Sequence, residues 1–254
     1  MGEKTSKIRL WAVIFWLAVW QLAAMGLARA YPHGSLLLAS PAAVLYRLGQ
    51  LAVTAAFWQT VGWSAARIFG GFLLSTLLAV LLAALAAWKN GVGELLAPLV
   101  AVIKAVPVAS FIILALVWLN SRSLSLFISA LMVFPPVYLN VLEGIRRTDG
   151  QLLEMARVFR VPFSRRLRYI YLPQIMPYFR TAVSLGLGLC WKAGAAAEVI
   201  GLPAGSVGER LYTAKVYFQT PDLFAWTVTI VAVSVLFERL FLFLTDRAAR
   251  KAGG

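Results

Sequence analysis

Long apolar runs separated by short polar or basic segments set the pattern of the chain. An α-helix needs about 20 mostly apolar residues to cross the hydrocarbon core of a bilayer. Six runs approach that length, and they predict membrane spans at residues 10–27, 68–88, 99–119, 124–142, 178–200 and 223–244. Between the first two, residues 28–66 mix apolar positions with Arg47, Gln50 and Gln59, which favours an interfacial helix leading into a span. The pattern predicts an all-α integral membrane protein.

Composition supports this prediction. The chain has 254 residues, 61% of them hydrophobic and 13% charged, whereas soluble domains carry about 25% charged residues. The single cysteine, Cys190, excludes an intrachain disulfide, and His33 without cysteine partners excludes an ordinary zinc site. We therefore expect no metal and no cofactor bound by this chain. No phosphate-binding G-x-x-x-x-G-K-[ST] motif is present, so any ATP consumed must be bound by another chain.

The first 30 residues resemble a secretory signal in part, with an early basic cluster and "ARA" at 28–30. The apolar run between them is about 18 residues long, more than the ~7–15 of a signal core. We expect the segment to be retained as the first span.

The basic residues indicate an orientation. The net charge is +14, and the arginines and lysines lie between apolar spans rather than along a polar stripe, which argues against a nucleic-acid partner. With six spans and a cytoplasmic N-terminus, fourteen basic residues fall in inner segments and five in outer ones. The inner ones are Lys4, Lys7, Arg9, Lys89, Arg146, Arg147, Arg157, Arg160, Arg165, Arg166, Arg168, Arg247, Arg250 and Lys251; the outer ones are Arg29, Arg47, Arg122, Arg210 and Lys215. The positive-inside rule then predicts that both termini are cytoplasmic.

The polar segment between the fourth and fifth spans is predicted to form two short helices. Thr148 and Gln151 have the spacing of a capping box, which predicts a helix starting near Asp149. Pro162 should end that helix and Ser164 should cap the next one. We expect Pro173 to end the second helix, and Pro177 to lie in the first turn of the fifth span.

The first of these helices is predicted to be amphipathic. Leu152, Met155, Ala156 and Phe159 recur at helical spacing, while Glu154 and the neighbouring arginines point elsewhere. The arginines alone are explained by topology and by anionic lipid. The apolar face is typical of a helix that docks in a groove of a partner. Both interpretations stay open on the residues alone.

This segment resembles a known motif. "EMA" at 154–156 and "LP" at 172–173 are similar to the EAA loop of ABC importer permeases, and the matching positions are Glu154, Ala156, Ile170, Leu172 and Pro173. Met155 stands where the family has alanine, and Arg160 where it has the glycine of the bend between two coupling helices. The second departure puts the geometry of that turn in question.

Other segments extend the resemblance from about residue 60 to 240. "ARIFGGFLLSTLLA", "VFPPVYLNVLEGIRRTD", "CWKAGAAAEVIG" and "GSVGERL" resemble the nitrate/sulfonate/taurine (NitT/TauT) branch of these permeases. The resemblance implies the type I importer fold, in a multi-pass protein of the bacterial cytoplasmic (inner) membrane. It further implies a second permease copy, as a homodimer, two cytoplasmic ABC ATPase subunits that bind ATP and Mg, and an extracytoplasmic substrate-binding protein.

These expectations define three regions. Residues 1–57 would hold the first span and an extracytoplasmic interfacial segment, residues 58–245 the permease domain with its cytoplasmic coupling loop at 143–177, and residues 246–254 a basic cytoplasmic tail. By the resemblance, ATPase coupling would fall on Leu152, Glu154, Met155, Ala156, Phe159, Arg160, Leu172 and Pro173. The chain would be a pore-forming subunit and no enzyme, carrying a small anionic or zwitterionic solute.

Two charged residues, Lys192 and Glu198, lie within the predicted fifth span, next to Trp191. A charge there costs several kcal/mol unless it is paired or faces water. Each could satisfy a neighbouring helix, or line the solute pathway. Their six-residue separation places them on different faces of a helix. A secondary transporter or a membrane adaptor remains the alternative function, although the sequence shows neither the internal repeat of the first nor a catalytic constellation.

Overall fold

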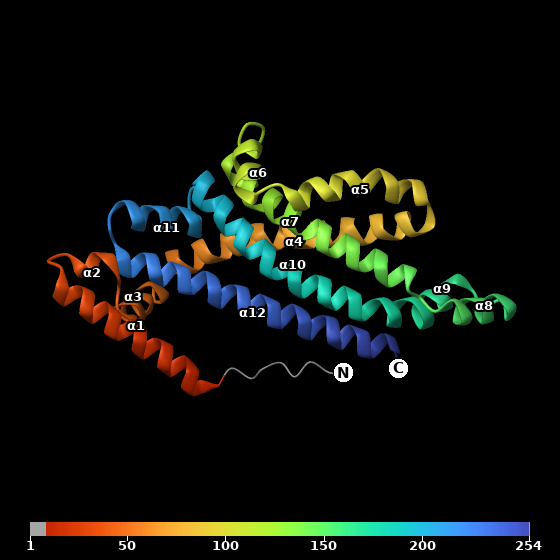
Figure 1. The fold of residues 1–254 in the computed structure, drawn as a ribbon, viewed down its shortest axis with the longest axis horizontal. Helices are drawn as coiled ribbons and strands as arrows, with labels where there is room; N and C mark the ends of the chain where they lie inside the picture. The colour runs from red at the N-terminus through yellow and green to blue at the C-terminus, as the bar shows by residue number, and fades with distance from the viewer. Residues whose placement is uncertain (1–8, 254) are drawn as a thin grey trace.

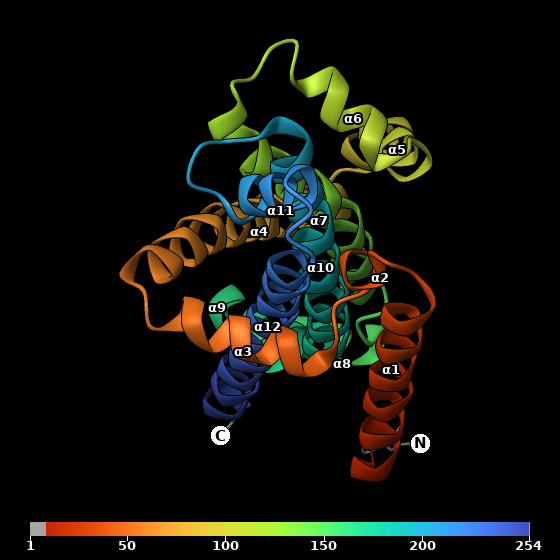
Figure 2. The ribbon, with the colours of Figure 1, turned by 90° about the vertical axis from the view of Figure 1, so that its left-hand side faces the viewer.

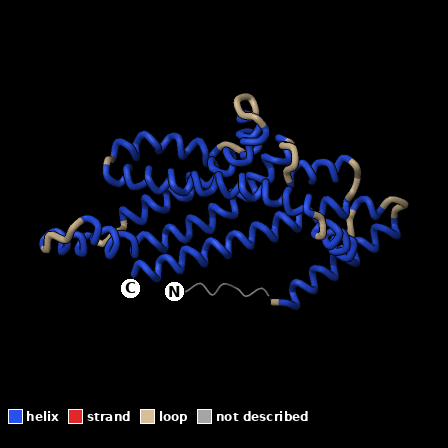
Figure 3. The backbone as a smooth tube through the Cα atoms, turned by 180° about the vertical axis from the view of Figure 1, so that it is seen from behind, coloured by secondary structure: helices blue, strands red, loops and turns tan. Residues whose placement is uncertain are grey.

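The computed structural model describes residues 9–253, and the side chains of these residues except those of residues 35 and 248–253. Four of the predicted inner charges are not covered: Lys4 and Lys7 lie outside the described residues, and the side chains of Arg250 and Lys251 are not described. Within it the secondary structure is entirely helical (Figures 1 and 3). In chain order the helices are α1 Leu10–Ala30, α2 Gly34–Leu37, α3 Pro41–Ala52, α4 Ala55–Trp88, α5 Asn90–Ala105, α6 Val108–Ala115, α7 Ser121–Arg146, α8 Gly150–Val158, α9 Phe163–Arg166, the π-helical turn η1 Leu167–Tyr171, α10 Leu172–Gly201, α11 Val207–Val216 and α12 Thr220–Gly253.

Five of the six predicted spans are single long helices, and the third is broken. Helices α1, α4, α7, α10 and α12 are long and apolar enough to cross a bilayer, whereas α5 and α6 are bent by 104° relative to each other. The third predicted span, at 99–119, therefore consists of two helices: α5 starts at Asn90 and ends before Val106, whose backbone is extended. Pro107 explains the break, because proline lacks an N–H and disfavours helical geometry at the residue before it.

Helix α7 forms the centre of the bundle, with α4 and α10 packed along it. The buried core comprises Ile68 and Phe72 of α4, Val133 and Val137 of α7, and Leu187 of α10. Viewed along the long axis, α5 and α6 lie on one side of these central helices and α1 and α3 on the other (Figure 2). The apolar side chains left exposed along the spans face the bilayer or another protein.

Helix α4 begins earlier than the predicted span at 68–88. Thr54 caps it by accepting a hydrogen bond from the Phe57 amide, and the helix then runs 34 residues, about 51 Å. A bilayer core of about 30 Å leaves the first turns outside it. The predicted interfacial segment is thus α3 together with the start of α4. The domain boundary at 57/58 falls in the first turn of α4, and the three-region division stays a prediction.

The two ends of the bundle differ. Helices α8 and α9 project at one end, where α12 also finishes, and α2, α3 and α11 gather at the other (Figure 1). At the second end, Arg47 of α3 donates two hydrogen bonds to Asp222 at the start of α12, one of them 3.0 Å long. This hydrogen bonding raises the pKa of Arg47 and ties the N-terminal region to the last helix. At the first end, Arg180 of α10 pairs with Asp246 of α12 at 3.0 Å.

Candidate functional site

The segment that connects α7 to α10 starts with a capped helix. Asp149 is the N-cap of α8, and its carboxylate accepts the Gln151 amide at 2.8 Å. The helix starts where the sequence predicts it, but the capping box does not form, because the Thr148 hydroxyl instead donates to the Gly144 carbonyl of α7. The Asp149 amide donates to the side chain of Gln174 at 2.8 Å. This bond joins the start of α8 directly to α10.

Arg160 occupies the left-handed position of the bend after α8. Its φ is +49°, in the region that favours glycine. The Val161 amide donates to the Ala156 carbonyl at 2.8 Å, and the Arg160 amide to the Arg157 carbonyl at 3.1 Å. This pattern is the Schellman motif, which usually has glycine at the left-handed residue. The turn therefore keeps the geometry of a glycine bend, and the structure accommodates the strain of a larger residue.

Helices α9, η1 and α10 form one continuous helical stretch from Phe163 to Gly201. Three predictions at this point are wrong: Ser164 lies inside α9 instead of capping it, Pro173 lies in the first turn of α10 instead of ending a helix, and Pro177 lies inside α10. Pro173 has no N–H for the carbonyl four residues earlier. Just before it, the Leu172 amide bonds to the Leu167 carbonyl, five residues back, which is the π-helical spacing.

Most of the predicted coupling residues are exposed, and one is not. Leu152, Glu154, Met155, Arg160, Leu172 and Pro173 are exposed, and Phe159 is 74% exposed. Ala156 is 1% exposed, already enclosed by this chain. The expectation that its side chain fits into a partner's groove is therefore corrected: its small size serves packing inside the loop. We use the name loop patch for the exposed apolar side chains of α8, the bend after it and the start of α9, which are Leu152, Met155, Val158, Phe159 and Phe163.

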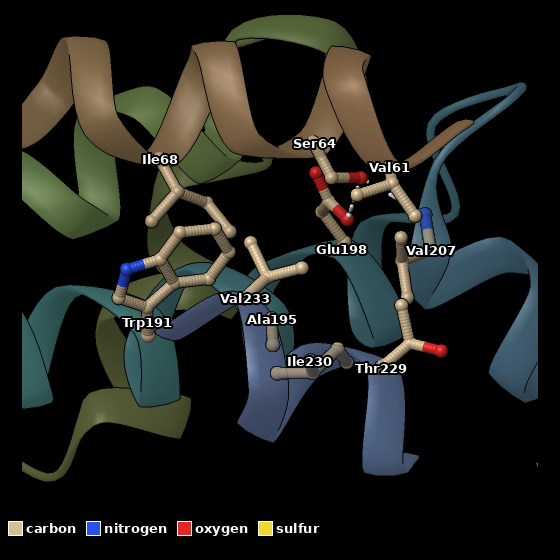
Figure 4. Close-up of a pocket in the computed structure, with 10 residues that line it drawn as sticks. All are labelled: Val61, Ser64, Ile68, Trp191, Ala195, Glu198, Val207, Thr229, Ile230 and Val233. Carbon is tan, nitrogen blue, oxygen red and sulfur yellow. Dashed lines mark hydrogen bonds between the residues drawn. The ribbon is translucent and has the colours of Figure 1, made fainter. Parts of the chain in front are cut away.

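Glu198 lies at a buried junction of three helices. Its side chain is 1% exposed, and Ser64 of α4 donates to its Oε2 atom at 2.7 Å. The Gly208 amide of α11 donates to the same oxygen at 3.3 Å. The Val207 amide donates to the Ser64 hydroxyl at 2.9 Å (Figure 4). A single carboxylate thus holds α4, α10 and the first turn of α11 together. We call this arrangement the Glu198 junction.

The space beside this junction is too small for a solute. Glu198 and Trp191 line the same cavity, which has a volume of about 10 Å³, room for one water molecule at most (Figure 4). Lys192, by contrast, is exposed on α10. The two charged residues therefore lie on different faces, as their spacing predicts. In this conformation Glu198 and Trp191 are buried, and Glu198 links helices of this chain. Of the three candidate pathway residues, only Lys192 has an exposed side chain that can contact a solute, lipid or a second permease copy.

Sequence reasoning missed the partners of Glu198 and one group of arginines. Ser64 and Gly208 lie 134 and 10 residues from Glu198 and carry no signal of their own in the sequence. Arg122 and Arg210 entered only as basic residues of outer segments, and Arg67 was not singled out, yet the three line one pocket. Among the described residues, no three histidine, cysteine or acidic side chains gather where a metal ion could bind.

Comparison with known proteins agrees with this architecture. Residues 75–252 match the family model described as "Binding-protein-dependent transport system inner membrane component". The chain belongs to this family of ABC importer permeases.

Individual relatives place it in the NitT/TauT branch. It is similar to the Bacillus subtilis permease SsuC, named for aliphatic sulfonates, with 27% identity over 92% of this chain and 83% of the relative. It resembles the bicarbonate transport system permease CmpB of Synechococcus elongatus at 25% identity, over 74% of this chain and 68% of the relative. The riboflavin transport system permease RibX of Chloroflexus aurantiacus is 28% identical over 84% and 81% of the two chains. The permease is therefore a multi-pass transport protein.

Proposed function

We propose that the permease couples to a separate ATPase through residues 143–177 and forms half of a translocation pathway in the bacterial cytoplasmic membrane. The observation that carries this proposal is the loop patch. It presents five exposed apolar side chains on a projecting, otherwise basic segment at one end of the bundle (Figure 1). Exposed apolar clusters with a polar surround are typical of protein-binding surfaces. A second permease copy and an extracytoplasmic binding protein complete the assembly.

The connection from the loop patch to the spans is mechanically direct. The stretch from Phe163 to Gly201 is one helix of 39 residues, about 58 Å long. It begins beside the loop patch and ends next to the Glu198 junction. The bond from the Asp149 amide to Gln174 adds a second link between α8 and α10. A displacement of α8 by an ATPase would therefore move α10 and, through the junction, α4 and α11, which supports alternating access driven from the loop.

The orientation follows from the same segment. The exposed arginines Arg157, Arg160, Arg165 and Arg168 lie in the same segment as the loop patch. Arg247, also exposed, belongs to the last turns of α12, and this helix finishes at the same end of the bundle (Figure 1). By the positive-inside rule this end is cytoplasmic. Both termini are then cytoplasmic, and α3 and α11 face outward. ATP and Mg belong to the partner ATPase, which faces the loop patch.

The solute proposed for this permease is small and anionic or zwitterionic. Relatives named for sulfonates and for bicarbonate support an anion. Lys192 is the exposed cation on α10 that the pathway would use.

The test is capture of the cognate ATPase by tagged permease variants at equal membrane abundance. Met155→Asp and Phe159→Asp place a charge in the loop patch without filling any buried space, and both should abolish capture and uptake, because an unpaired charge at a docked surface costs several kcal/mol. Ala156→Asp should do the same by unfolding the loop. Glu154→Ala should weaken coupling more than assembly. Val53→Asp, at an exposed position (87%) at the opposite end, is the matched control and should leave both unchanged.

Two outcomes reject the coupling role. If both loop-patch variants retain the ATPase and transport normally, the segment serves only as a lipid anchor. If no ATPase accompanies the wild-type permease while purified protein still transports its solute, the chain works as a secondary transporter.

A further inference from the structure

A polar pocket at the end opposite the loop patch gathers three arginines from different elements. Arg67 comes from the middle of α4, Arg122 from the first turn of α7, and Arg210 from α11. Together with Gln59, Thr60 and Trp63 they line a space of about 480 Å³. The remaining lining is Ala56, Ala204 and Gly205. We call this space the arginine pocket; it contains no acidic side chain in its lining.

The arginines of the pocket have no ion-pair partner among the described residues. Arg67 shows this most clearly, because its Nη1 atom is buried and donates to no acceptor among the described residues. Its guanidinium lies 5.7 Å from the ring of Trp63, which holds it in place. Glu209 precedes Arg210, but its carboxylate accepts the Gly205 amide at 2.6 Å. Arg47, a neighbour at the same end, is by contrast paired with Asp222.

This arrangement suits an oxyanion. A buried guanidinium donor without an acceptor costs free energy comparable to a lost hydrogen bond to a charged group. The three guanidinium groups converging on this space repel each other. The buried Glu198 carboxylate, outside the pocket lining, is close enough to interact electrostatically with Arg67, but one negative charge offsets only part of the repulsion among three positive ones. Arginine donors match the planar and tetrahedral oxygens of carboxylate, bicarbonate and sulfonate groups. The volume falls within the range of about 300–1,000 Å³ that small-molecule sites occupy.

We propose that the arginine pocket binds the oxyanion group of the transported solute, a sulfonate or carboxylate type of anion, at the outward end of the permease. The proposal rests on the transport function and deepens it by naming a solute class and a site. Arg67 immediately precedes the apolar run of α4, so the pocket lies at the edge of the bilayer.

The test measures anion access to Trp63, which lines the pocket and is 56% exposed. The full-length permease is placed in phosphatidylcholine nanodiscs, and iodide quenching of its tryptophan fluorescence is recorded. Subtraction of the same measurement on Trp63→Phe isolates the Trp63 signal. Ethanesulfonate should protect Trp63 from iodide more strongly than an equal concentration of chloride, because its three oxygens can bind several guanidinium groups at once.

Substitution of each arginine provides the decisive comparison. Arg67→Gln, Arg122→Gln and Arg210→Gln should each raise the ethanesulfonate concentration needed for half protection by about ten-fold, the loss expected for one charge-assisted hydrogen bond. Lys215→Gln removes an exposed charge from α11 outside the pocket and should change it less than two-fold. Arg122 and Arg210 are exposed, so their substitution leaves the fold intact even if Arg67→Gln fails to fold.

Three results would overturn the proposal. In the first, ethanesulfonate gives no more protection than chloride. In the second, Lys215→Gln weakens protection as much as the pocket variants do. In the third, iodide quenching of Trp63 is weak in lipid nanodiscs, insensitive to ethanesulfonate, and strong in lipid-free detergent; the pocket then binds a phospholipid headgroup. None of these results depends on the ATPase. The quenching test can therefore reject anion binding in the arginine pocket while ATPase capture still supports the proposed coupling function, and the capture test can reject coupling while the quenching test still supports anion binding.

Discussion

Gly208→Ala should disrupt the Glu198 junction, because the added methyl group has no room there. A Cβ built at Gly208 would lie 2.3 Å from the Glu198 Cβ, 2.4 Å from its carbonyl carbon and 2.5 Å from the Val199 nitrogen. Ordinary carbon contacts are about 3.5–4.0 Å long. Two of the three opposing atoms belong to the backbone of α10 and cannot rotate away. Helix α11 must therefore move outward by about 1 Å or more.

That movement has an energetic consequence that can be worked out from the contacts. The bond from the Gly208 amide to Glu198 is already 3.3 Å long, so a further 1 Å removes it. Overpacking of a tight interior costs about 1–3 kcal/mol, and losing a hydrogen bond to a carboxylate costs about 1.5–3 kcal/mol. We expect a total destabilisation of about 3 kcal/mol or more. For a chain of this size, that corresponds to a fall in unfolding temperature of about 6–12 °C.

Cys190 makes the assay possible, because it is the single cysteine and is fully buried. A fluorogenic maleimide reacts with it only as the purified permease unfolds on heating. Gly188→Ala is the matched control on α10, since a Cβ there meets nothing within 4 Å and should be neutral or slightly stabilising. If Gly208→Ala unfolds within about 2 °C of wild type, α11 does not pack on Glu198 as described, and the junction is not a structural link.

Three further predictions address the loop, the span and the orientation. Arg160→Gly should raise the unfolding temperature by about 2–4 °C and leave uptake normal, because it removes about 1 kcal/mol of left-handed strain; a severe uptake defect would show instead that the arginine contacts a partner. Lys192→Ala should lower uptake without changing Cys190 reactivity, since the side chain is exposed; a loss of stability would contradict the pathway role. In intact cells, a cysteine at Ser164 should resist an impermeant thiol reagent while one at exposed Ala204 reacts, and the opposite result would reverse the orientation.

Spans are predictable from this sequence because the bilayer imposes one strong constraint on every segment. The apolar runs place all six spans, since a spanning backbone must satisfy its hydrogen bonds internally. Prolines show where the prediction stops. Pro107 breaks the third span, whereas Pro135 and Pro136 lie inside an unbroken α7. In α7 the Asn140 side chain donates to the Pro136 carbonyl, and helices α4 and α10 pack along both sides. Residue type alone cannot separate the two cases, because the packing that supports α7 comes from distant segments.

The sites show the same division between local and long-range information. The bend after α8 could be anticipated, because a family glycine at the position of Arg160 indicates a left-handed residue, and the backbone there has a φ of +49°. The burial of Ala156 could not, because an amphipathic pattern does not reveal whether its apolar face meets its own chain or a partner. The arginine pocket was hidden for a related reason. Its three arginines are 55 and 88 residues apart along the chain, each explained individually by a span end, and only the packing of α4, α7 and α11 brings them to one space. A charge that a topology rule explains can therefore still serve a binding site. Among the described residues these three arginines form no ion pair, and this distinguishes them from Arg47.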